Sequence, residues 1–227
     1  MHFMAVNEEK YLEIINELIP QNVTLVAVSK IKPEEDILAL YNLGQRDFGE
    51  NYVQELVDKE QKLPKDICWH FIGHLQSNKI KYIAPFIHLV HGVDSYKLLK
   101  EINKQAAKNK RIINVLLQVH IAQEHTKFGL DEKELSEILQ VDQSGLSDLK
   151  NINVSGLMGM ASFTDDKELI KKEFAYLKSL FDKYAKFQAP NCKLQTLSMG
   201  MSDDYKIAVE EGSTMVRIGS LLFGRRI

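Results

Sequence analysis

The sequence lacks the features that mark secreted, membrane-spanning and nucleic-acid-binding proteins. Its 227 residues include two cysteines. These residues, Cys68 and Cys192, are too few for a disulfide framework, which favours a reducing, cytoplasmic environment. No apolar run approaches the roughly 20 residues that span a bilayer, and residues 1–10 carry no secretory signal pattern. The net charge of −2 provides no general attraction to nucleic acid or to an acidic membrane. We therefore expect neither nucleic acid nor membrane as a partner.

Repeats, low-complexity tracts and linkers rich in proline, glycine or serine are also missing. Apolar residues make up 44% of the chain and charged residues 26%, which is close to the average for globular proteins. The length is as natural for one barrel as for two small domains. We therefore expect a single domain over residues 1–227.

The chain instead contains a regular alternation of strand-like and helix-like segments. The apolar spacing predicts a first helix over residues 5–19, which Pro20 ends. Strands are then expected at residues 23–29, 46–49, 67–72, 87–91, 112–120, 152–157, 194–197 and 214–218. Helices are expected between them, at residues 34–43, 51–61, 77–84, 95–109, 131–140, 166–187 and 203–211.

This alternation predicts an α/β fold with parallel strands and crossover helices. Eight strands in a chain of this length favour a single (β/α)8 TIM barrel with an extra N-terminal helix. The alternative is a doubly wound open sheet, which binds ligands at a switch point in its strand order. No GxGxxG motif follows the first strand to mark such a point, so the barrel is preferred.

A lysine, Lys30, closes the first predicted strand. Burial lowers the pKa of a lysine amine, and a neutral amine is a nucleophile that forms a Schiff base with an aldehyde. The position therefore suits covalent attachment of an aldehyde, provided that the chain also binds the rest of that ligand.

Two segments rich in glycine and serine, 197–204 and 217–224, follow the seventh and eighth predicted strands. Barrels commonly bind phosphate at this position, where glycine lets the backbone approach an anion and free N–H groups of a helical turn point at it. Ser198, Ser202 and Ser220 add hydroxyl donors. The alternative is that these residues only cap helices.

Arg217 lies in the eighth predicted strand, next to the first strand in a closed barrel. A buried arginine needs a partner. One interpretation pairs it with a carboxylate such as Glu50 or Asp94, and the other makes it a donor to a ligand heteroatom. An amine, an arginine and a phosphate site on one face suit an aldehyde that carries a phosphate and a ring heteroatom. Pyridoxal 5′-phosphate has all three.

The chain resembles the pyridoxal phosphate homeostasis proteins, a family related to the barrel domain of alanine racemase. The resemblance covers nearly the whole chain. The matching motifs lie at residues 27–30, 48–55, 69–79, 91–95, 126–129, 156–160, 198–204, 216–220 and 223–224.

This resemblance implies which residues surround the cofactor. Lys30 is expected to form the internal aldimine with pyridoxal 5′-phosphate. Ser198, Gly219 and Ser220 are expected around the phosphate. Arg217 is expected to face the pyridine nitrogen, and Asn51 to lie beside the ring.

The resemblance also implies a function without established catalysis, in vitamin B6 and amino-acid homeostasis, so no catalytic residue is assigned. Partners would be the cofactor and the apoenzymes that use it. The alanine racemases take a second acid/base from a C-terminal β domain, and this chain stops at Ile227, so we expect a binding protein and a monomer. The alternatives are a slow amino-acid racemase and, less favoured, a Schiff-base aldolase acting on a sugar phosphate.

His70 and His74 have the spacing of metal ligands on a helix. Their segment is predicted to be strand and loop, and no carboxylate completes a helical HExxH motif. We therefore expect no metal at this pair. Lys127 is interpreted either as a residue that anchors its loop or as a site residue. Glu50 is interpreted as a counter-ion within the barrel.

Overall fold

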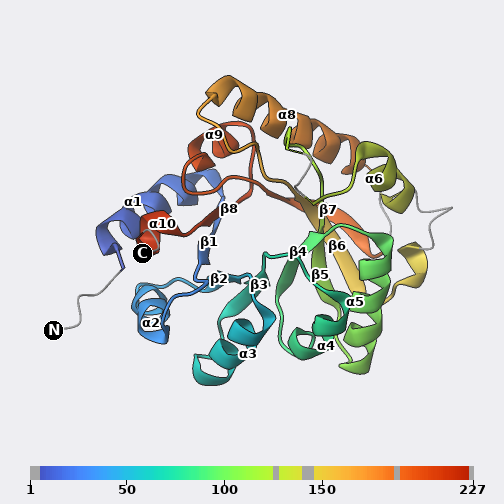
Figure 1. Cartoon of the computed structure of the whole chain (residues 1–227), viewed down its shortest axis with the longest axis horizontal. Helices are drawn as coiled ribbons and strands as arrows, with labels where there is room; N and C mark the ends of the chain where they lie inside the picture. Colours follow the sequence, from blue (N-terminus) through green and yellow to red (C-terminus); the bar gives the residue numbers. More distant parts are fainter. Residues whose placement is uncertain (1–5, 125–127, 140–145, 187–189, 225–227) are drawn as a thin grey trace.

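A computed structural model describes residues 6–124, 128–139, 146–186 and 190–224. Eight parallel strands form a closed barrel in the order of the sequence, with β1 paired to β8, and the helices lie around the outside (Figure 1). The strands are β1 (Thr24–Val28), β2 (Asp47–Glu50), β3 (Cys68–Phe71), β4 (Leu89–Val93), β5 (Ile113–Gln118), β6 (Ile152–Met158), β7 (Cys192–Ser198) and β8 (Met215–Ile218).

The predicted (β/α)8 barrel with an N-terminal helix is therefore confirmed. The helices are α1 (Glu8–Leu18), α2 (Glu34–Asn42), α3 (Val53–Lys62), α4 (Ile80–Ile83), α5 (Tyr96–Lys108), α6 (Glu132–Leu139), α8 (Lys167–Tyr184), α9 (Tyr205–Glu210) and α10 (Ser220–Phe223). Among the described residues, three short 3-10 turns accompany them: η1 (Ile19–Gln21), η2 (Ser77–Lys79) and η3 (Leu146–Asp148).

The differences from the predicted elements lie at their ends. The helix expected at residues 77–84 begins as the 3-10 turn η2 and becomes α-helical only at Ile80. The short helix α10 was not predicted, because four residues are too few to show helical periodicity. Parts of the expected helices at residues 5–19, 131–140 and 166–187 lie outside the described residues.

The core has two parts, because each barrel strand has an inner and an outer face. Five buried residues form a small cluster, with one residue each from β1, β4, β5, β6 and β8. Because side chains from strands around the whole barrel meet in it, the cluster lies inside the barrel. These residues are Val26, Leu89, Leu116, Met158 and Met215. The larger cluster fills the layer between the strands and the helices and includes Phe48, Phe174 and Leu177.

Helix α1 lies beside the last helix of the chain, α10 (Figure 1). The Asn7 side chain caps α1 by accepting a hydrogen bond from Lys10 N. The Asn7 backbone N–H donates to Leu222 O at 2.8 Å. The first helix therefore supports the region in which the barrel closes between β8 and β1.

None of the helices in the described residues combines the length and the apolar composition that a membrane crossing requires.

Candidate functional site

The turn that carries Lys30 follows β1 directly, and its neighbour Ser29 anchors it. The Ser29 hydroxyl donates to Glu50 Oε1 at 2.6 Å, and Lys59 Nζ donates to Ser29 O at 2.8 Å. Both partners lie on the side of β1 that faces α3. Since successive side chains of a strand point to opposite faces, Val26 and Val28 of β1 lie on the inner face of the barrel, and Lys30 follows two residues later in the turn. Lys30 is half-buried.

The next residue, Ile31, has a φ of 61°. A β-branched residue rarely adopts this left-handed conformation, which costs of the order of 1–3 kcal/mol. Its backbone N–H donates to Glu55 Oε1 at 2.6 Å, and the same oxygen accepts from Lys59 Nζ at 2.6 Å. Contacts with α3 therefore hold the lysine turn in a strained shape.

The ion pair behind this turn is buried. Lys59 Nζ lies 2.8 Å from Glu50 Oε1, and their side chains are 6% and 0% exposed. Burial holds the pKa of Glu50 above its usual value, although the Lys59 charge acts in the opposite direction. The prediction that Glu50 is a barrel counter-ion is confirmed, and its partner is Lys59. Sequence reasoning missed Lys59 and Glu55, although their four-residue spacing on a helix is typical of an ion pair.

Arg217 is 4% exposed and projects from β8. Its Nη1 donates to Ser198 Oγ at 2.6 Å and its Nη2 to Gly159 O at 3.1 Å. Burial lowers the pKa of the guanidinium to about 10, so the group stays charged at neutral pH.

The suggested ion pair of Arg217 with Glu50 or Asp94 is wrong. Glu50 pairs with Lys59 on the outer side of the barrel, and Asp94 Oδ2 lies 3.3 Å from His74 Nδ1. Within the described part of the chain, no carboxylate oxygen comes within 4.0 Å of the Arg217 guanidinium. Its two hydrogen-bond partners are neutral.

The segments after β7 and β8 contact each other, as the phosphate-site interpretation requires. Arg217 N donates to Gly200 O at 3.0 Å, and Gly219 N lies 3.3 Å from Ser202 Oγ, which accepts its hydrogen bond. Gly200 has a φ of 96°, a conformation that glycine adopts without a steric penalty. The first turn of α10 begins immediately afterwards, and its first N–H groups have no partner within the helix.

The barrel closure brings these segments next to the lysine turn. A Cβ atom on Gly219 would lie 3.3 Å from both Cβ and O of Val28, and Val28 is two residues before Lys30. In the pairing of β1 with β8, Val26 lies opposite Arg217 and Ala27 lies opposite Ile218. The predicted attachment point and the predicted phosphate segment are therefore neighbours.

Two of the predicted phosphate-site serines have different surroundings. Ser198 is fully buried, and its Oγ contacts Arg217 and lies 3.2 Å from His91 Nδ1. Ser220 is exposed and, with Asn7 and Glu8, lines an open cavity of about 580 Å³ beside α1. Ser198 therefore contacts Arg217 inside the barrel, whereas Ser220 lies at an open cavity that the acidic residue Glu8 also lines.

Asn51 follows β2 and carries an unsatisfied acceptor. Its Oδ1 is buried and has no hydrogen-bond partner among the described residues. A buried polar atom without a partner costs of the order of 1–3 kcal/mol and is rare in native proteins. A ligand that donates to Asn51 would remove this cost, so the residue fits a binding site.

His70 and His74, the spaced histidine pair, do not act together. His70 is fully buried, whereas the His74 side chain is 47% exposed, pairs with Asp94 and stacks on Phe128 with ring centroids 4.3 Å apart. That no metal binds at this pair stays a prediction. Lys127 lies outside the described residues.

The fold and the site define a barrel of the alanine racemase type. Residues 9–226 match the family described as "Alanine racemase, N-terminal domain". The pyridoxal phosphate homeostasis protein of Aquifex aeolicus is 40% identical over 203 residues, which is 89% of this chain and 86% of that protein. The chain belongs to the pyridoxal phosphate homeostasis protein family.

Solved structures agree with this assignment. PipY of Synechococcus elongatus has been solved without and with pyridoxal phosphate bound. At 35% identity the two structures match 98% of this chain and 100% of their own, with TM-scores of 0.88 and 0.85. Alanine racemase from Bartonella henselae is 17% identical, with a TM-score of 0.71 over 93% of this chain and 56% of its own. That last match shows the fold alone.

Proposed function

We propose that residues 1–227 form one domain that binds pyridoxal 5′-phosphate at the carboxyl-terminal end of the barrel and acts in vitamin B6 and amino-acid homeostasis. The observation that carries the proposal is the closure of β1 against β8. It sets the lysine turn two residues from the backbone that contacts Gly219. The structure of PipY with pyridoxal phosphate bound, in a protein 35% identical over 98% of this chain, supports it.

Each predicted site residue has a role in this proposal. Lys30 attaches the cofactor covalently, and Asn51 contacts the ring through its unsatisfied buried oxygen. Arg217 donates to the ring nitrogen. The backbone of Gly219 and Ser220 binds the phosphate at the start of α10. Ser198 supports the phosphate site indirectly, because its Oγ accepts a hydrogen bond from Arg217.

We further propose that the chain binds without turnover. When bound, pyridoxal phosphate supplies a reactive aldehyde and a ring that withdraws electrons best when its nitrogen is protonated beside a carboxylate. Arg217 is a donor with no acceptor atom, and its pKa of about 10 keeps it charged at neutral pH. It therefore does not stabilise a proton on that nitrogen. Because racemases share an arginine here, this feature lowers the activity without excluding it.

The test is the colour of the purified protein, followed by reduction with borohydride and peptide mapping. A visible absorbance band and a label on Lys30 are expected. Lys30→Ala should lose both and retain weak phosphate binding, because the β7 and β8 segments remain. Lys81→Ala removes a surface lysine of α4 and should match the unmodified protein. A label on another lysine would contradict the assignment.

Arg217→Glu tests the contact with the ring nitrogen. A carboxylate there makes the nitrogen more basic, so the spectrum of the bound cofactor should shift. An unchanged spectrum would show that residue 217 does not touch the ring.

A slow amino-acid racemase is the second candidate, favoured by the alanine racemase fold. It is distinguished by exchange of the α-proton of amino acids in deuterated water. We expect exchange much slower than about 1 per second, the lower end of typical enzymatic turnover. Exchange at or above that rate would contradict the proposal of binding without turnover and would support a racemase.

Cofactor-dependent apoenzymes are the proposed recipients, and a monomer is the proposed active form. The covalent bond to Lys30 is reversible, so the protein can release as well as store the cofactor. Mixing the loaded protein with an apoenzyme should restore that enzyme's activity, and sedimentation should give the mass of a single chain.

A further inference from the structure

A row of buried polar side chains crosses the barrel interior below the proposed cofactor site. His70 on β3 and His91 on β4 are fully buried, and His70 Nδ1 lies 2.9 Å from His91 Nε2. His91 Nδ1 lies 3.2 Å from Ser198 Oγ, at the carboxyl end of β7. The row therefore connects the end of the barrel that holds Arg217 with the opposite, amino-terminal end.

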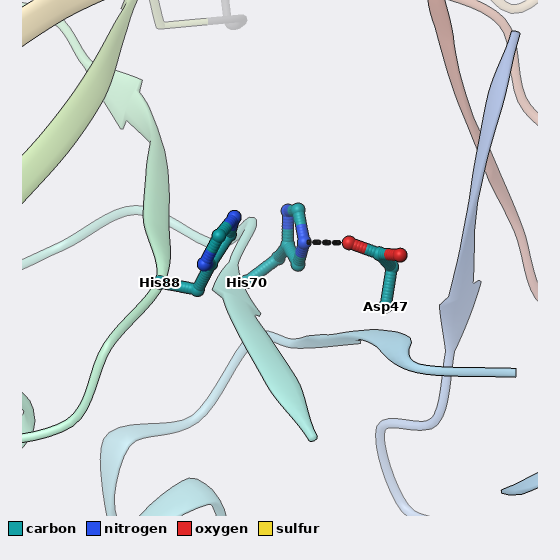
Figure 2. Close-up of side chains that lie close together, drawn as sticks. All are labelled: Asp47, His70 and His88. Atoms are coloured by element: carbon teal, nitrogen blue, oxygen red, sulfur yellow. Dashed lines mark hydrogen bonds and ion pairs between the residues drawn. The ribbon is translucent and has the colours of Figure 1, made fainter. Parts of the chain in front are cut away.

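At that opposite end, His70 meets two further side chains that bind metals (Figure 2). Asp47 is the first residue of β2, and His88 directly precedes β4. Figure 2 shows the His70 ring between the His88 ring and the Asp47 carboxylate. His70 Nε2 lies 2.9 Å from Asp47 Oδ1, and one ligand atom from each of the three residues lies within 4.8 Å of the others.

We propose that Asp47, His70 and His88 bind a divalent transition-metal ion of the zinc class. Two imidazoles and a carboxylate are a donor set that zinc uses when it keeps a fourth position open. With bonds of about 2.0–2.1 Å, neighbouring donors around tetrahedral zinc lie roughly 3.3 Å apart. The Asp47–His70 pair is a few tenths of an ångström from this spacing. His88 is exposed, so a rotation of its side chain brings its nitrogen closer without disturbing the core.

The contact behind His70 is the second observation that supports a metal. A histidine that binds a metal through one ring nitrogen normally donates the N–H of the other to an acceptor, which fixes the ring. Metal at His70 Nε2 leaves the proton on Nδ1, and His91 Nε2 is in place to accept it at 2.9 Å. Full burial of both rings holds this orientation before any metal arrives.

The surrounding charges favour a reversible site. The Asp47 carboxylate attracts a cation. The positive charge of Arg111 acts in the opposite direction, because it disfavours a further positive charge at His88. The Arg111 guanidinium donates to Ala84 O and Ile87 O, so it is held near the site and opposes a cation. We therefore expect a metal that exchanges with solution.

Zinc titration of the metal-free protein, monitored by calorimetry, tests the site. One zinc ion per chain is expected. His88→Asn and Asp47→Asn should each weaken binding at least about tenfold, by analogy with the loss on changing metal-site partners. The matched control is His74→Asn, an exposed histidine that also pairs with a carboxylate, and it should bind zinc like the unmodified protein. His88 is exposed, so its variant should keep the circular dichroism of the fold.

Three results would overturn the site. These are no zinc binding, equal binding by the unmodified protein and His88→Asn, or a loss in His74→Asn as large as in His88→Asn. The last two would show that zinc binds to other surface groups.

The same row of side chains gives the metal an effect at the other end of the barrel, an extension that rests on the proposed function. Metal at His70 makes His91 a donor to Ser198 Oγ through Nδ1. The Ser198 hydroxyl proton is then no longer directed at His91 and can be donated to an acceptor at the carboxyl end. Zinc should therefore tighten binding of pyridoxal phosphate, by about fivefold if the coupling is at the low end of that for linked sites.

Titration of pyridoxal phosphate with and without zinc tests this link, with His88→Asn as the variant in which zinc should have no effect. Equal affinities with and without zinc, in protein shown to bind zinc, would overturn the link. Absence of pyridoxal phosphate binding in the zinc-free protein would instead contradict the proposed function.

Discussion

Two buried cations, Lys59 on α3 and Arg217 on β8, have opposite surroundings. Counted as whole residues, Lys59 and Arg217 are 5% and 4% exposed, respectively. Lys59 Nζ contacts two carboxylates, Glu50 at 2.8 Å and Glu55 at 2.6 Å. Arg217 contacts a hydroxyl and a carbonyl, both neutral.

This difference separates a structural cation from one available to a ligand. An isolated buried charge costs several kcal/mol, which a counter-charge in good geometry offsets. The protein itself supplies that counter-charge to Lys59, on the α3 side. It supplies none within 4.0 Å of Arg217 in the described residues, so the charge of Arg217 is available to an electron-rich group of a ligand. The unsatisfied Asn51 oxygen is a further polar group available to a ligand, and it follows β2, which lies on the other side of β1 from β8.

The largest expected effect comes from breaking the structural pair. Lys59→Met leaves Glu50 buried without its partner and should lower the free energy of unfolding by roughly 3–5 kcal/mol. Lys62→Met is the control on the same helix, because its pair with Glu34 is at the surface and should contribute less than about 1 kcal/mol. Urea unfolding measures both. Equal stability of the two variants would contradict a structural role for Lys59.

Arg217→Met should have the opposite balance of effects. Methionine removes a buried charge that is costly to desolvate, which offsets the loss of the hydrogen bonds to Ser198 and Gly159, so the free energy of unfolding of the ligand-free protein should fall by less than in Lys59→Met. The affinity for pyridoxal phosphate should fall at least about tenfold, because a hydrogen bond from a charged group is lost. Urea unfolding and cofactor titration separate the two effects. A loss of stability as large as that of Lys59→Met would remove the distinction.

The unsatisfied oxygen of Asn51 gives a similar contrast at about 1 kcal/mol. Asn51→Leu removes a buried acceptor without a partner and should stabilise the ligand-free protein by about 1 kcal/mol while weakening cofactor binding. Asn153→Leu is the matched control, because Asn153 Nδ2 donates to Asn114 Oδ1 at 2.9 Å, and it should be destabilised by a similar amount. Thermal unfolding without and with cofactor measures both. Destabilisation by Asn51→Leu would show that its oxygen has a partner.

The strained residue after Lys30 should respond to glycine. Ile31→Gly relieves a left-handed conformation that costs roughly 1–2 kcal/mol for an L-residue, although it also frees the unfolded chain. A net gain in the free energy of unfolding of about 0.5–1 kcal/mol is expected. Asn22, with a φ of 56°, tolerates this region, so Asn22→Gly should change stability by a few tenths of a kcal/mol at most. A loss of stability in Ile31→Gly would mean that the Ile31 side chain contributes more than its strain costs.

The smallest expected effect is the pH dependence of Glu50. Burial raises its pKa in the folded protein, so its contribution to stability is largest below its ordinary pKa and is lost as pH rises through the raised value. The stability of the unmodified protein relative to Glu50→Gln should therefore fall as the pH rises above about 4.3, the ordinary pKa of a glutamate. Urea unfolding at several pH values measures this difference. An increase with pH would show that the attraction of Lys59 outweighs burial.

The order and type of the strands could be predicted because the pattern repeats. Each strand is a short apolar run, and each crossover helix has its own apolar spacing. The ends were less predictable, as at η2 and α10, because a single helical turn has no periodicity to detect.

The site was predicted in part. The positions of Lys30, Arg217 and Gly219 follow from the rule that barrel sites form where the strands end. The partners of Arg217 did not follow, because hydrogen bonds between β6, β7 and β8 depend on register and strand stagger. Asp47 and His88 also escaped detection as companions of His70, because they are separated from it by 23 and 18 positions in the printed sequence.

The sequence by itself determined the class of fold, the family and the location of the lysine turn beside the last strand, since local apolar patterns and chain order are sufficient for these. Only the tertiary structure decided which buried charges are neutralised by the protein and which polar groups remain for a ligand. Those outcomes depend on distances of a few tenths of an ångström between residues far apart in the chain, and no local pattern encodes them.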